Sequence, residues 1–175
     1  MLSQKTAYPG NGNVEISVDD VKTLNSQPPT SSFKLNIRVP GWCVGQAVPS
    51  DLYTQAVPGT LKDFTLKVNG EAVEVQPVKG YCVLERCWKK GDVIAVKMNM
   101  PVRRIKAHEK VVANKGRAAF ERGPVVYCAE GVDNGARVRN KAVALDAAVT
   151  ESSCDILGNV FPAFSVPAVT IEKRV

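Results

Sequence analysis

The segment Phe33-Lys34-Leu35-Asn36-Ile37-Arg38-Val39 alternates apolar and polar side chains without interruption. Successive side chains on a strand point to opposite faces, so this pattern predicts a strand with one face on a core and the other in water. The same period of two recurs at residues 14–18 and 64–68. These segments predict a protein built mainly from antiparallel strands.

Turn signals separate the predicted strands. Asn69-Gly70 lies between residues 64–68 and 71–75, and a type I′ hairpin turn needs positive φ at both of its central positions, which favours this pair. A further strand pair is expected around the turn Lys89-Lys90-Gly91-Asp92, over residues 81–88 and 93–100. Weaker strand candidates follow at residues 117–120, 125–128, 142–145 and 166–171, and a single helical turn is expected at residues 19–24.

Length and composition place the chain among globular proteins. It has 175 residues, 45% of them hydrophobic and 23% charged. With no apolar run of about 18 residues and no apolar leader, we expect a soluble chain without a membrane span or signal peptide, in a compartment the sequence does not indicate. Many short strands predict an all-β, antiparallel β-sandwich. Because the pattern resets near residues 101–108, we expect one complete module at 1–107 and part of a second at 108–175.

Positive charge is concentrated at this predicted junction. Residues 101–122 hold seven Lys or Arg against two Glu, a net +5 of the chain's +6. Arg103, Arg104, Lys106 and Lys110 are candidates for a basic surface that meets another domain; the alternative is a solvated strand face that discourages edge pairing. No aromatic residue lies between Arg103 and Lys110, as base stacking would require, so we expect no nucleic-acid partner.

The sequence offers no catalytic or metal-binding motif. His108 is the only histidine, and the five cysteines form no C-x-x-C pair, so we expect no catalytic residue, cofactor or metal in this chain. The cysteines are expected to be buried or half-buried free thiols. Trp42 and Trp88 could form a platform for sugar stacking; the alternative is that both are buried anchors of the sandwich.

Eight elements occur in an order and spacing that resemble the C-terminal β-sandwich region of glycoside hydrolase family 127, the β-L-arabinofuranosidase family. They are TAYPGNGNVEI (6–16), IRVPGWC (37–43), PSDLY (49–53), VNG (68–70), GY (80–81), RCWKKGD (86–92), MPVRR (100–104) and FERGPVVYCAE (120–130). The resemblance covers residues 3–134. Beyond it, residues 156–160 are a candidate counterpart of a later strand. Gly10 stands where the family usually has tryptophan.

The resemblance implies chemistry that lies outside this chain. Family members carry an (α/α)₆ barrel that hydrolyses terminal arabinofuranosides with retention, using a cysteine thiolate on a zinc ion. No cysteine here matches a family ligand, so zinc is expected in the barrel.

We therefore expect an inactive accessory sandwich that packs on such a barrel and that self-associates when it is separated from the barrel. The alternative is a carbohydrate-binding module using Trp42 or Trp88. A third hypothesis, an immunoglobulin-type adhesion domain, is supported by the architecture alone.

Overall fold

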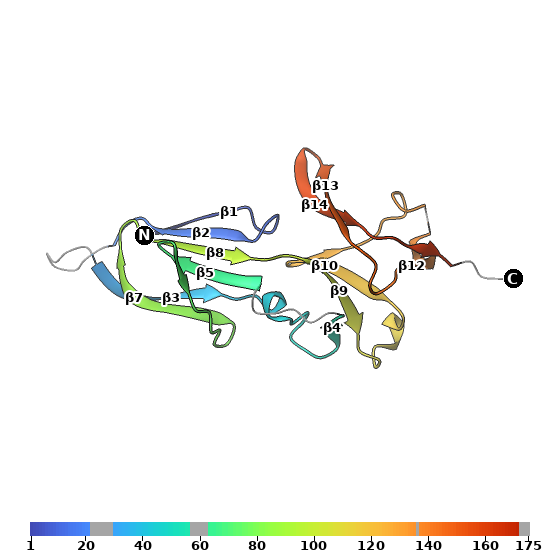
Figure 1. The fold of residues 1–175 in the computed structure, drawn as a ribbon, viewed down its shortest axis with the longest axis horizontal. Helices are drawn as coiled ribbons and strands as arrows, with labels where there is room; N and C mark the ends of the chain where they lie inside the picture. Colours follow the sequence, from blue (N-terminus) through green and yellow to red (C-terminus); the bar gives the residue numbers. More distant parts are fainter. Residues whose placement is uncertain (22–29, 57–62, 136, 172–175) are drawn as a thin grey trace.

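The computed structural model describes residues 1–21, 30–56, 63–135 and 137–171. Its largest unit is a five-stranded antiparallel sheet at one end of the molecule (Figure 1). Its strands follow the spatial order β1-β2-β8-β5-β6, namely Leu2–Thr6, Asn13–Val18, Val93–Met98, Phe64–Val68 and Glu71–Val73. The alternation that predicted these strands is visible in β5, where every second side chain is buried.

A second layer covers this sheet. Strands β3 (Thr30–Arg38) and β7 (Tyr81–Lys89) pair along their whole length and turn their apolar side chains toward the larger sheet. The most completely buried side chains come from both layers and the loops beside them: Trp88, Leu66, Ile94, Val18 and Cys43. Each large apolar side chain buried this way contributes about 1.5–3 kcal/mol. The predicted all-β, antiparallel sandwich is confirmed.

The predicted Asn69-Gly70 turn is also confirmed, with φ of 51° and 85°. It is tied to the turn between β7 and β8, because Asn69 Nδ2 donates to Asp92 Oδ1 at 2.9 Å and Val93 N donates to Asn69 Oδ1 at 2.8 Å. Asp92 Oδ2 in turn accepts from Lys89 N at 2.8 Å. These bonds lower the pKa of Asp92, and they join two hairpins that are distant in sequence.

A four-stranded sheet lies beyond β8. Its order is β11-β10-β9-β4, with β11 at Val125–Tyr127, β10 at Ala118–Arg122, β9 at Val102–Ala107 and β4 at Tyr53–Gln55. β4 has only three residues, too short for an alternating pattern to predict. The division expected after residue 107 falls between β9 and β10, which are paired with each other. It stays a prediction.

The chain ends in two small sheets. β13 (Thr150–Ile156) and β14 (Asn159–Ser165) form a hairpin, and β12 (Lys141–Ala142) pairs with β15 (Val169–Thr170). Residues 156–160, the candidate counterpart of a later strand, are divided by the turn of this hairpin: Ile156 ends β13 and Asn159 begins β14. Leu157 and Gly158 have φ of 54° and 80°, so the chain reverses there.

Helical structure is limited to short 3-10 turns in the part of the chain that is described. They are η1 (Gly41–Val44), η3 (Val112–Asn114) and η4 (Val138–Asn140). The turn expected at residues 19–24 is absent from 19–21, and its remaining residues lie outside the described chain. No helix within the described ranges is long and apolar enough to cross a membrane.

Candidate functional site

Trp88 does not serve as a sugar platform, contrary to one of the two hypotheses. Its side chain is 0% exposed, and its indole Nε1 donates to the carbonyl of Phe33 at 3.0 Å. The Phe33 ring lies against it with centroids 5.8 Å apart. A buried ring cannot receive a saccharide, so Trp88 is an anchor of the sandwich, which was the alternative weighed for it.

Trp42 is half-buried at the start of η1, at the end of the sandwich that faces β9. The guanidinium of Arg103 lies over its ring, 5.4 Å from the centroid. Burial raises the pKa of Tyr8, and the neighbouring Trp42 side chain partly offsets that rise. Trp42 therefore joins the loop after β1 to β9, and the stacking hypothesis rests on this residue alone.

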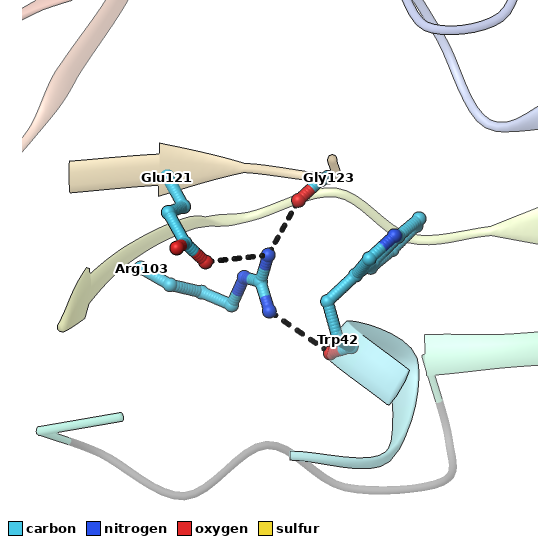
Figure 2. Close-up of polar contacts among 4 residues, drawn as sticks. All are labelled: Trp42, Arg103, Glu121 and Gly123. Carbon is cyan, nitrogen blue, oxygen red and sulfur yellow. Dashed lines mark hydrogen bonds and ion pairs between the residues drawn. The ribbon is translucent and has the colours of Figure 1, made fainter. Parts of the chain in front are cut away.

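Arg103 is the centre of this junction (Figure 2). Its Nη1 donates to the Trp42 carbonyl at 3.1 Å, and its Nη2 donates to the Gly123 carbonyl at 2.5 Å. The same Nη2 lies 3.4 Å from Glu121 Oε2. β9 and β10 set this geometry, because Arg103 and Glu121 are direct partners in the antiparallel register and project from the same face.

Desolvation governs the electrostatics of the pair. The side chains of Arg103 and Glu121 are only 8% and 16% exposed. Burial lowers the pKa of Arg103 and raises that of Glu121, and each partner only partly offsets the shift of the other. A buried pair of this kind adds little net stability, but removing one partner leaves an uncompensated charge. The junction is therefore a structural clamp between η1, β9 and the turn after β10.

The predicted basic surface is divided by the sheet. Arg103 is buried, so its assignment to a surface was wrong: it alternates inward on β9 and reaches backbone carbonyls instead of solvent. Arg104, on the opposite face, is half-buried; it lies 5.5 Å from the Phe120 ring centroid and donates to the Ala147 carbonyl. Lys106 and Lys110 are exposed, and for them the interdomain role stays a prediction.

Arg122 forms a second clamp, which the sequence did not predict. Arg122 Nη1 donates to the Gly10 carbonyl at 3.2 Å, and its Nε lies 3.7 Å from Glu151 Oε2. Tyr127 Oη donates to the Pro162 carbonyl at 3.0 Å, which holds the β13–β14 hairpin against the same sheet face. The sequence does not indicate this role of Arg122, because its partners Gly10 and Glu151 are 112 and 29 residues away along the chain.

The cysteines are free, and their environments differ. Cys43 and Cys82 are buried, whereas Cys87, Cys128 and Cys154 are exposed, which corrects the expectation that all five are at least half-buried. Burial raises the pKa of Cys43 to about 12, so this thiol is a poor nucleophile. No three His, Cys, Asp or Glu side chains of the described residues come together as zinc ligands would. These residues do not fit a zinc centre.

Two family models match this chain. Residues 1–100 match the middle domain of GH127 β-L-arabinofuranosidase, and residues 102–172 match the glycoside hydrolase family 127 C-terminal domain. The non-reducing end β-L-arabinofuranosidase of Bifidobacterium longum subsp. longum is 31% identical over 96% of the chain, which covers 23% of that protein.

Two solved structures of GH127 enzymes are also similar to this chain. A GH127 β-arabinofuranosidase is 34% identical with a TM-score of 0.85, over 97% of this chain and 25% of its own. A GH127 β-L-arabinofuranosidase from Geobacillus stearothermophilus T6 is 32% identical with a TM-score of 0.78, over 98% and 24%. The chain thus spans about a quarter of the length of these relatives. By its sequence elements, its sandwich and both family models, this chain belongs to glycoside hydrolase family 127, of which it represents the middle and C-terminal domains.

Proposed function

We propose that this chain is a non-catalytic accessory unit that supports the (α/α)₆ catalytic barrel of an arabinofuranosidase-type hydrolase. One observation carries the proposal: the matched regions are a middle and a C-terminal domain, about a quarter of the relatives' length. The two arginine clamps support it, since they hold the two domains in one arrangement. In this proposal the nucleophile and zinc belong to the barrel.

The test is an activity measurement on the 175-residue chain alone. Incubated with a chromogenic β-L-arabinofuranoside, with and without added zinc, it should release no arabinose above the rate of a buffer blank. Release that disappears when the chain is heat-denatured would contradict the proposal, because it would place a working active site within these residues.

Carbohydrate binding through Trp42 is the second candidate. A saccharide site needs a few convergent polar groups beside an aromatic face, and the Arg103 guanidinium occupies one face of this ring. Calorimetry with arabinan oligosaccharides tests it. Binding heat that Trp42→Ala abolishes, with the thermal unfolding midpoint reported alongside, would favour this candidate over a purely supporting role.

A further inference from the structure

An apolar cavity of about 250 Å³ lies between the loop after β1 and the β13–β14 hairpin. Ala7, Pro9 and Gly10 line one side, and Val160, Phe161 and Pro162 line the other. A cavity of about 150 Å³ is large enough for a benzene ring, so this one admits a phenyl or indole side chain. It lies where the middle domain and the C-terminal domain meet.

Both walls are held in place by contacts already described. Arg122 bonds the Gly10 carbonyl on one side and approaches Glu151 of β13 on the other. Tyr127 holds the Pro162 carbonyl, and the Phe164 ring packs 4.9 Å from the Tyr127 ring. These bonds fix the separation between the β13–β14 hairpin and the loop after β1, so the cavity between them is preformed.

Two apolar side chains of the lining are themselves exposed. The exposed fractions are 71% for Val160 and 47% for Phe161. Single exposed apolar side chains are ordinary, but exposed ones that line an apolar cavity mark an interaction site.

The chemistry of the cavity selects its occupant. A saccharide needs convergent hydrogen-bonding groups, and Asn159 is the one polar residue of the described lining. The chain covers only 23% of the Bifidobacterium relative, and its first part matches a middle domain, so a further region precedes that domain in family 127 proteins. We propose that a bulky apolar side chain of that region inserts between the loop after β1 and the β13–β14 hairpin, an inference that rests on the proposed function.

Binding in trans tests this docking surface. The N-terminal regions of the Bifidobacterium and Geobacillus relatives, expressed separately, are titrated with the 175-residue chain in a calorimeter. Val160→Lys should weaken binding at least tenfold, because it places a charge at the cavity rim. The matched control is Val78→Lys, a valine 65% exposed outside this surface, which should change affinity less than twofold.

The outcomes separate the inference from the function on which it rests. Binding that both variants leave unchanged overturns the docking surface and leaves the accessory role standing. No binding of the unmodified chain to either region overturns the accessory role, and the docking surface with it. Self-association of the chain that Val160→Lys abolishes, and that neither region competes away, assigns the cavity to a second copy and overturns the proposed occupant.

Discussion

Replacing Arg103 by methionine should reveal how strongly the junction depends on one side chain. The change keeps most of the aliphatic stem and removes the guanidinium from Glu121, the Trp42 carbonyl and the Gly123 carbonyl. Breaking a buried ion pair by removing one partner costs about 3–5 kcal/mol. Because the Glu121 side chain keeps 16% exposure, we expect the lower end, about 3 kcal/mol. That is a large part of the stability of an ordinary domain, about 5–15 kcal/mol.

Urea unfolding followed by tryptophan fluorescence measures this cost, since Trp42 lies beside the lost guanidinium. Arg86→Met is the matched control: Arg86 is exposed, and its guanidinium lies 5.3 Å from the Trp88 ring centroid. An exposed cation–π contact is worth about 0.5–1 kcal/mol. If Arg103→Met costs no more than Arg86→Met, the junction is not the clamp described here.

The same variant should change the dependence of stability on pH. Burial raises the pKa of Glu121 and Arg103 lowers it, so the pKa rises further when Arg103 is removed. A carboxyl with a raised folded-state pKa binds more protons folded than unfolded, so the free energy of unfolding falls as pH rises from the unfolded pKa through the folded one. The cost of Arg103→Met should therefore be smaller at pH 5 than at pH 7. Combining it with Glu121→Gln should remove that difference.

Three further outcomes are expected. Asp92→Ala should lower the free energy of unfolding by about 2 kcal/mol at pH 7, because two hydrogen bonds to a carboxylate are lost. The pKa of Asp92 is lowered in the folded state, so this contribution to stability should be lost as pH falls through the folded-state pKa. Urea unfolding at several pH values measures both effects. Gly123→Ala should cost at least about 1 kcal/mol in the same assay, since φ is +58° and its Cβ would lie 2.8 Å from Met100 Sδ. Cys87 should react with a thiol reagent at pH 8 in the native protein while Cys43 stays unreactive until urea is added, and equal rates would contradict the burial of Cys43.

These contacts explain why several of the family motifs have the residues they do. The VNG and GD elements are joined by the bonds between Asn69 and Asp92, which couple two hairpins. The ERG element supplies Glu121, Arg122 and Gly123, whose side chains and carbonyl group form both clamps. Glu121, Arg122 and Gly123 thus take part in holding the two domains together, and none of these residues requires a reacting substrate for its role.

The sequence by itself determined the strands of the sandwich, because a period of two is a local property: each inward side chain of β3, β5 and β8 can be recognised from its neighbours. The Asn69-Gly70 turn is equally local, since it depends on the φ preferences of two residues. The family resemblance rests on the same kind of information, short elements in order along the chain.

Only the tertiary structure decided which way the charged and aromatic side chains face. Trp42 and Trp88 have the same residue type, but one lies at the junction and the other at the centre of the core, because burial depends on the second layer of the sandwich. Arg103 and Arg104 are neighbours on one strand and face different parts of the molecule. The cavity beside the β13–β14 hairpin depends on residues more than a hundred positions apart, which no local pattern contains.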